Sequence, residues 1–528
     1  MATRARRQPS FLLFVTDQQR ADHLGCYGDP VVRTPAIDGL ALQGCVFDDF
    51  HVATPICQPN RASLMTGRLP SAHGLTLNGR ELSQGETTFV DMLRQAGWRT
   101  ALAGKCHLQN ITGLPPVWPS PQERLPRDAR HLHPGDYGQE NARRWADDDR
   151  FELALPYYGF EQVRLTIGHA DEQQGHWRRW LRAQLPDADR LIGPDNAVPT
   201  PSLALGALRQ AWRTRVPEEL YPTAYIAGQA CTMLREFAAG ERPFFLQCSF
   251  PDPHHPFTPP GRYWSLHRPG DMALPASFHA DLVDPPPPIA WLRAARAGRA
   301  AGPVGYASFA CSEQEAREAL ALNYGSIACI DDAVRRVLAE LAALGLDDDT
   351  VVMFTSDHGE LLGERGLMFK GGLHYGALTR VPFVWRDTVD RRRAARSPVL
   401  AQTTDIAPTV LARAGLLPAH GMQGRSLLAP MAQPGTPLRD ALLIEEESQR
   451  RDFGLPGRLR MRTLRTAGHR LTIYDGQPWG ELYDLREDPM ELRNLWNSQP
   501  ALRDALGRQL AGAMLAQADT SPYPDAAS

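Results

Sequence analysis

Two pairs of polar residues each follow a short apolar run that is typical of a buried strand. Asp17-Gln18 follows residues 11–16 (FLLFVT), and Asp357-His358 follows the run that begins with residues 350–355 (TVVMFT). Because the carboxyl ends of parallel strands meet at one edge of a sheet, we expect the two pairs to lie together. Two carboxylates, an amide oxygen and an imidazole would form a site for a hard divalent cation.

Lysine is almost absent from the chain. Of 57 basic residues only Lys105 and Lys370 are lysines, and the rest are arginines. A compact ammonium group binds a tetrahedral oxyanion as a point charge, whereas a guanidinium group donates in a plane and needs more room. The two lysines are therefore candidates for binding an oxyanion.

A cysteine-containing string is the strongest single motif. It begins at Cys57 and reads CQPNRASLMTGR, with Arg61 four residues later. The string resembles the signature of the sulfatase family, in which the cysteine is oxidised after translation to formylglycine. The aldehyde hydrates to a geminal diol, one oxygen of which attacks while the other later expels the bound sulfate.

Other stretches resemble the same family. They are GKCHL at 104–108, PHHP at 253–256, GLMFKG at 366–371, TDIAPT at 404–409 and ELYDLREDPMELRNL at 481–495. Both lysines fall on positions of these motifs. The resemblance spans about residues 11–495, with an insertion at about 112–222 outside it.

The resemblance implies roles for the site residues. Arg61 positions the formylglycine, Lys105 and Lys370 bind sulfate oxygens, and His107 takes the diol proton. Lys370 and His254 lie near the leaving oxygen, and Asn78 contacts the transferred group. We expect His73, His255 and His374 to be structural residues or to line the rim.

The expected metal ligands are Asp17, Gln18, the modified Cys57, Asp357 and His358. Sulfatases commonly carry Asp-Asp at the first pair and Asp-Asn at the second, so Gln18 and His358 depart from that pattern. The departures reduce the ligand charge and add a nitrogen. We expect one Ca²⁺ ion, with Mn²⁺ as the alternative.

The predicted function is hydrolysis of a small-molecule sulfate ester with release of inorganic sulfate. The first alternative is a phosphonate monoester or phosphodiester hydrolase of the same superfamily, because Gln18 and His358 resemble that branch. A second alternative is a non-catalytic anion- or metal-binding relative. A formylglycine-generating enzyme is the implied maturation partner.

Strands alternating with helices must position these residues. We predict strands at 11–16, 99–103, 243–250 and 350–355, and helices at 34–42, with Thr34 as the N-cap, at 87–96 and at 313–344. The pattern predicts an α/β fold, which the resemblance identifies as an alkaline-phosphatase-like, mostly parallel sheet sandwiched by helices. We expect a catalytic domain at 1–430, whose insertion holds loops and short helices. A small antiparallel sheet with one helix is expected at 431–528.

Composition excludes several classes of protein. The net charge of -3 gives no reason to expect nucleic acid as a partner. No apolar run reaches the roughly 18 residues of a membrane span. Residues 11–16 are too short for a signal-peptide core, so a cytoplasmic location is expected. The 8 cysteines show no disulfide framework. The oligomeric state stays open, and a homo-oligomer is compatible with the sequence.

Overall fold

The computed structural model describes most of the chain. The described residues are 8–114, 132–201, 203–297, 304–305, 307–387, 395–434, 436–448, 453–455 and 457–521. The basic start of the chain before residue 8, and residues 115–131 and 202 of the predicted insertion, lie outside them.

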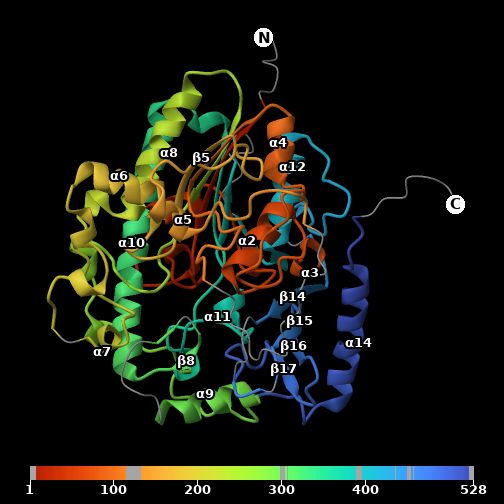
Figure 1. The fold of residues 1–528 in the computed structure, drawn as a ribbon. Helices are drawn as coiled ribbons and strands as arrows, with labels where there is room; N and C mark the ends of the chain where they lie inside the picture. Colours follow the sequence, from red (N-terminus) through yellow and green to blue (C-terminus); the bar gives the residue numbers. More distant parts are fainter. Residues whose placement is uncertain are drawn as a thin grey trace, which may run out of the picture.

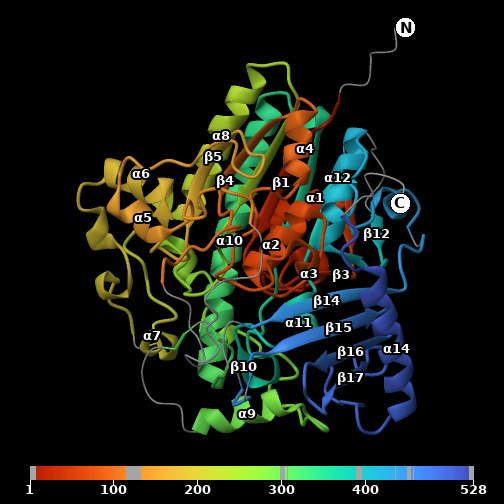
Figure 2. The ribbon, with the colours of Figure 1, turned by 45° about the vertical axis from the view of Figure 1, so that its right-hand side comes forward.

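A large sheet forms the centre of the molecule (Figures 1 and 2). In the described part of the chain it has nine strands, in the order β12 (Ala395–Ser397), β2 (Cys45–Phe47), β11 (Phe383–Arg386), β9 (Thr350–Ser356), β1 (Ser10–Thr16), β7 (Phe244–Ser249), β4 (Arg99–Gly104), β5 (Gln162–Ile167) and β6 (Gln174–Gly175). The five strands from β9 to β5 are mutually parallel. Their carboxyl ends therefore lie along one edge of the sheet.

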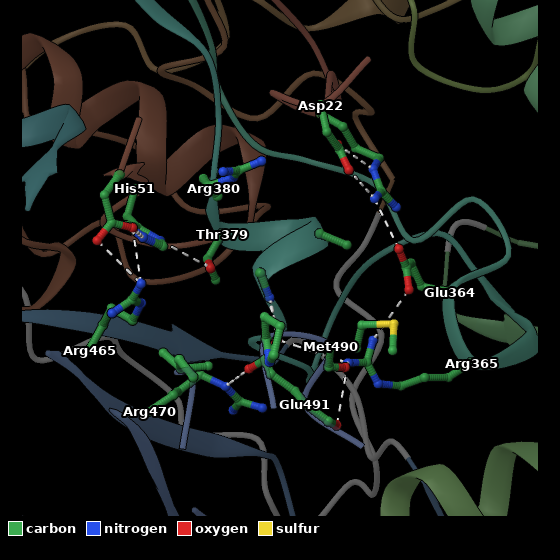
Figure 3. A pocket seen from close by; sticks show the side chains of 16 residues that line it. Asp22, His51, Glu364, Arg365, Thr379, Arg380, Arg465, Arg470, Met490 and Glu491 are labelled. Carbon is green, nitrogen blue, oxygen red and sulfur yellow. Dashed lines mark hydrogen bonds and ion pairs between the residues drawn. The ribbon is translucent and has the colours of Figure 1, made fainter. Parts of the chain in front are cut away.

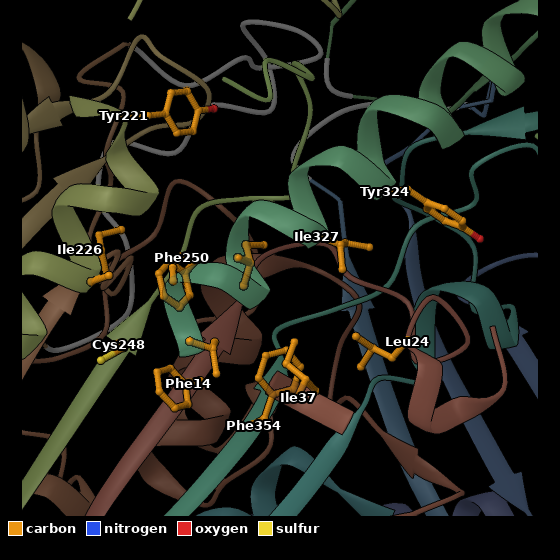
Figure 4. Packing of buried hydrophobic residues seen from close by; sticks show 14 of the residues in the cluster. Phe14, Leu24, Ile37, Tyr221, Ile226, Cys248, Phe250, Tyr324, Ile327 and Phe354 are labelled. Carbon is orange, nitrogen blue, oxygen red and sulfur yellow. The ribbon is translucent and has the colours of Figure 1, made fainter. Parts of the chain in front are cut away.

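Alternate residues of β1 enter two different cores, as expected for a strand covered on both faces. Leu12 and Phe14 pack on one side, where Figure 4 shows Phe14 among apolar residues of α8 (Pro222–Ala238) and α10 (Glu313–Ala343). Phe11 and Leu13 pack on the other side. That second layer is formed by α2 (Cys57–Thr66), α4 (Phe89–Gln95) and α12 (Ile406–Ala414). The predicted α/β sandwich is confirmed.

Shorter elements surround the large sheet. The helices are α1 (Pro35–Leu42), α3 (Pro70–His73), α5 (Ala142–Asp147), α6 (His176–Gln184), α7 (Ala204–Ala207), α9 (Pro287–Ala297), α11 (Gly376–Thr379) and α13 (Leu428–Ala432). Two small paired sheets join β3 (Phe50–His51) to β13 (Ala401–Gln402), and β8 (Phe309–Ala310) to β10 (Leu367–Met368).

The last part of the chain forms the expected small antiparallel sheet and helix. The strands are β14 (Ala441–Glu447), β15 (Arg460–Thr466), β16 (His469–Tyr474) and β17 (Gly480–Asp484), and the helix is α14 (Pro500–Ala516). Leu506 and Leu510 of α14 pack against Leu464, Leu471 and Leu482 of the sheet. A domain boundary at 430 stays a prediction.

Ion pairs join this small sheet to the preceding part of the chain around a cavity of about 400 Å³ (Figure 3). Arg465 of β15 donates to both carboxylate oxygens of Asp49 at 3.0 and 3.2 Å.

On β14, Glu446 accepts from the backbone N–H of Gly372 at 2.6 Å and contacts His374 Nε2 at 3.1 Å. The small sheet therefore holds the loop that follows Lys370.

Two local predictions were wrong. The insertion contains loops and short helices, but it also supplies β5 and β6, because β5 pairs in parallel with β4 and extends the large sheet. Thr34 precedes α1 as predicted, but its side chain does not cap that helix. The carboxylate of Asp331 on α10 accepts from the N–H groups of Ala36 and Ile37 instead, because it lies within 3.1 Å of them.

Among the described residues, we find no helix that is both long enough and apolar enough to cross a lipid bilayer.

Candidate active site

The predicted site residues converge at the carboxyl edge of the parallel strands. Asp17 follows β1, Asp357 follows β9, and Lys105 follows β4. His254 follows β7 in a loop, and Lys370 follows the short strand β10. These side chains are all at least nine-tenths buried. Residues more than 300 positions apart in the sequence therefore share one buried site.

Four of the five expected metal ligands lie close together. One ligand atom each of Asp17, Cys57, Asp357 and His358 lies within 4.8 Å of the others. Among the described residues, Oδ1 of Asp17 and Nε2 of His358 are buried without a hydrogen bond of normal geometry and lie 3.4 Å from each other. Buried polar atoms without a good hydrogen bond are costly, and a bound cation would satisfy both of these atoms. The donor set therefore fits a divalent ion.

The pKa of His358 supports the same fit. Burial and the Lys370 ammonium lower it, but the carboxylates of Asp357 and Asp17, with Cys57, outweigh them and raise the pKa to about 9. The local field thus favours positive charge between these groups.

Gln18, the fifth expected ligand, uses its side chain to connect other residues. Its Oε1 accepts from Lys370 Nζ at 2.8 Å. Its Nε2 donates to Glu360 and lies 2.8 Å from Nδ1 of His255. The backbone N–H of Gln18 donates to Asp357 Oδ1 at 3.1 Å. Gln18 therefore borders the predicted metal cluster, and its role as a ligand stays a prediction.

Cys57 is the first residue of α2, so its thiol lies at the positive end of a helix dipole. Burial raises the pKa of the thiol, but the ammonium groups of Lys370 and Lys105 and a hydrogen bond with His107 lower it well below its usual range. Asn78 Nδ2 approaches Sγ at 3.8 Å. The predicted nucleophile position thus faces the predicted oxyanion-binding groups.

Arg61 lies one helical turn after Cys57 and connects four strand ends. Its Nε donates to Asp357 Oδ2 at 2.7 Å, and one terminal nitrogen donates to Ser249 Oγ at 2.8 Å and to the Lys105 carbonyl at 3.2 Å. The other lies 3.5 Å from Asp17 Oδ2. Arg61 therefore contacts both carboxylates of the predicted metal cluster.

The two lysines have matching surroundings. Lys105 Nζ donates to Asp17 Oδ2 at 2.5 Å and lies 2.8 Å from Nε2 of His169. Lys370 Nζ donates to Gln18 Oε1 and lies 2.8 Å from Nε2 of His254. Each ammonium is thus fixed by one oxygen and one imidazole.

His169, Glu360 and Ser249 belong to this site but were not predicted. Glu360 and Ser249 lie within five residues of predicted site residues, so proximity in the motif strings could have identified them. His169 comes two residues after β5, and only recognition of residues 162–167 (QVRLTI) as a strand would have signalled it. Of the three remaining histidines, His255 contacts Gln18 in the wall of the site, whereas His73 and His374 bind Ser63 and Glu446 outside the cluster.

Comparison with known proteins agrees with this geometry. The family model described as Sulfatase matches residues 9–113 and 201–416, and the model described as N-sulphoglucosamine sulphohydrolase, C-terminal, matches residues 363–516. The chain belongs to the sulfatase family of sulfuric ester hydrolases, within the alkaline-phosphatase-like group.

Individual relatives cover most of the chain. It is 27% identical over 497 residues to the uncharacterized sulfatase YidJ of Escherichia coli K12, covering 93% of this chain and 83% of the relative. The chain is 26% identical over 502 residues to an arylsulfatase of Clostridium perfringens, covering 93% of this chain and 91% of that relative. The crystal structure of the phosphonate monoester hydrolase of Agrobacterium radiobacter is similar at 26% identity, covering 97% of each chain with a TM-score of 0.74.

Proposed function

We propose that the protein hydrolyses sulfate esters of the arylsulfatase type through a formylglycine formed from Cys57, releasing inorganic sulfate. The observation that carries this proposal is the buried cluster of Cys57, Asp17, Asp357 and His358, whose ligand atoms lie within 4.8 Å of one another, with the Lys105 ammonium 2.5 Å from Asp17 Oδ2. The match to the sulfatase family supports it. A formylglycine-generating enzyme is the proposed maturation partner.

Formylglycine would supply a hydrated aldehyde, whose one oxygen attacks sulfur and whose other oxygen later expels sulfate. The chain's own residues prepare this reaction. His107, whose side chain helps to lower the pKa of Cys57, would take the proton of the second hydroxyl. Lys105 and Lys370 would stabilise the charge that grows on the transferred oxygens, and Asn78 would contact the same group.

The pair formed by Lys370 and His254 would serve the leaving group. Their nitrogens are 2.8 Å apart and share a proton between them. A proton held there could pass to the alcohol oxygen as its bond to sulfur breaks. Burial, the neighbouring ring of His169 and the charge of Lys370 keep the pKa of His254 well below its usual range, so its Nε2 is the accepting partner of this pair.

A divalent ion, which we propose to be Ca²⁺, would be held by Asp17, Asp357, His358 and the modified residue 57, with Gln18 beside them. When bound it would supply positive charge near the transferred oxygens. Mn²⁺ is the alternative, because His358 adds a nitrogen to a set of oxygen donors.

A second candidate function is hydrolysis of phosphonate monoesters or phosphodiesters. Gln18 and His358 favour it, as does the similarity to the Agrobacterium radiobacter hydrolase at 26% identity. The Lys105 and His107 positions favour the sulfatase.

Relative rates would separate the two functions. Protein co-expressed with a formylglycine-generating enzyme should be assayed on 4-nitrophenyl sulfate and on a phenylphosphonate ester, with Cys57→Ala as the control. A higher kcat/KM for the sulfate ester that is lost in the control supports the proposal. A higher kcat/KM for the phosphonate ester would assign the second function instead.

A further inference from the structure

His169 reaches the site from the insertion. It follows β5 after Gly168, whose φ of 95° is a backbone conformation that suits glycine. Residues 114–200, which include β5 and His169, lie outside the match to the Sulfatase family model. The parallel pairing of β5 with β4 brings His169 to the same edge as Lys105.

The contacts of His169 determine its protonation. Its Nε2 lies 2.8 Å from Lys105 Nζ. An ammonium group only donates, so Nε2 must accept and the ring proton must lie on Nδ1. Among the described residues, two of the three Lys105 protons are then engaged, by Asp17 Oδ2 and by His169. The third can point to an oxygen of the transferred group.

His169 and His254 form a stacked pair. Their ring centroids are 3.7 Å apart and the rings are 11° from parallel. Each ring accepts from one of the two lysines through Nε2, since His254 lies 2.8 Å from Lys370 Nζ. The stack therefore sets the spacing between the imidazoles that hold the two ammonium groups.

A second metal site is excluded at this position. One ligand atom each of Asp17, His169 and His254 lies within 4.8 Å of the others, which would suit a cation. However, Lys105 Nζ lies 2.5 Å from Asp17 Oδ2 and 2.8 Å from His169 Nε2. The ammonium group already supplies the positive charge there, and a second cation beside it would be repelled.

We propose that His169 is a positioning residue, which fixes the Lys105 ammonium against the transferred group by accepting its hydrogen bond. The inference deepens the proposed function and rests on it. Because the hydrogen bond and the stack are separate contacts, single substitutions can remove one without the other.

Two variants separate the contacts. His169→Phe keeps a ring to stack on His254 but removes the acceptor, whereas His169→Gln keeps an acceptor for Lys105 but removes the ring. We expect His169→Phe to lower kcat by about tenfold or more with KM changed less than about threefold, because the lost interaction acts mainly in the transition state. His169→Gln should stay within about threefold of wild-type kcat.

The double variant Lys105→Ala/His169→Phe tests whether His169 acts through Lys105. Its kcat should equal that of Lys105→Ala alone within about twofold, since residues in one pathway are not additive. Wild-type kcat in His169→Phe, equal losses in His169→Phe and His169→Gln, or full additivity in the double variant would each overturn the inference.

The assay uses whichever ester the wild-type protein hydrolyses. A wild type that carries formylglycine yet turns over neither a sulfate nor a phosphonate ester would refute the proposed function itself. Failure of the inference instead appears as the pattern of the His169 variants in an active enzyme, so the two failures are distinguishable.

Discussion

Arg61 Nε donates a 2.7 Å hydrogen bond to Asp357 Oδ2, which connects the helix of Cys57 to the strand end that carries two predicted metal ligands. Both side chains are buried, so this ion pair is shielded from solvent. The charge-assisted bond thereby couples the predicted nucleophile to the predicted metal cluster.

Arg61→Lys should weaken both folding and turnover. Lysine keeps the charge but cannot reach Asp357, Ser249 and the Lys105 carbonyl together. We expect a loss on the order of 2 kcal/mol in the free energy of unfolding, measured by urea denaturation, because buried acceptors lose their donor. We expect kcat to fall by about a hundredfold. Arg235→Lys, in the exposed pair with Glu340, is the matched control and should change neither. A wild-type kcat in Arg61→Lys would show that Arg61 does not position the catalytic residues.

Lys105→Arg and Lys370→Arg should each lower kcat by about a hundredfold while KM and stability change little. The charge survives, but a planar guanidinium cannot replace a compact ammonium that is already held by an oxygen and an imidazole 2.8 Å away. Steady-state kinetics measures the effect. The control is the opposite exchange at an exposed position, Arg150→Lys, which should leave kcat unchanged. Turnover near wild type in either variant would place that lysine outside the site.

Asp17→Asn and Asp357→Asn should remove most of the bound metal. Each loses one of the two negative charges in the four-residue cluster, and hard cations depend on carboxylate charge. Metal content after dialysis, measured by plasma emission, should fall well below that of wild type and of the exposed control Asp475→Asn. Full occupancy in both variants would show that the ligands have been assigned wrongly.

His73 should make the fold sensitive to acid. Its Nδ1 accepts from the Leu75 N–H at 3.2 Å and its Nε2 lies 3.0 Å from Ser63 Oγ. Burial, with the charge of Arg68, lowers the pKa of His73 to about 3. The pKa of His73 in the folded state lies below the unfolded value of about 6.5. The folded state is therefore fully stable with respect to His73 above about pH 6.5, and that stability is lost as the pH falls from about 6.5 toward about 3.

The His73→Asn variant can keep the acceptor for Leu75 but does not titrate. The free energy of unfolding of the wild type should therefore drop relative to this variant by about 1 kcal/mol per pH unit below 6.5. Urea denaturation at several pH values measures the difference. Curves that stay parallel down to pH 5 would rule out His73 as a source of acid sensitivity.

The central strands and their chemistry were predictable because their signals are local. The apolar run before Asp17 and the run before Asp357 each end in a polar pair, and their parallel pairing follows from general rules for α/β sheets. The capping box of Ser312 and Glu315 likewise lies within four residues of the start of α10.

The features that the sequence did not predict depend on contacts between residues far apart in the chain. The alternating run of β5 is a weak signal inside a segment rich in proline and arginine, and its strand character comes from pairing with β4. His169 enters the site only through that pairing. Asp331 replaces the Thr34 side chain at the start of α1 from 294 residues away, which no local pattern can indicate.

The most direct test is the chemical state of residue 57. The protein should be co-expressed with a formylglycine-generating enzyme, digested, and the peptide containing Cys57 examined by mass spectrometry after treatment with a thiol-alkylating reagent and with a hydrazide. We predict a peptide that resists alkylation and forms a hydrazone, in proportion to the specific activity of the preparation. An active preparation in which this peptide carries only an alkylated thiol would contradict the mechanism.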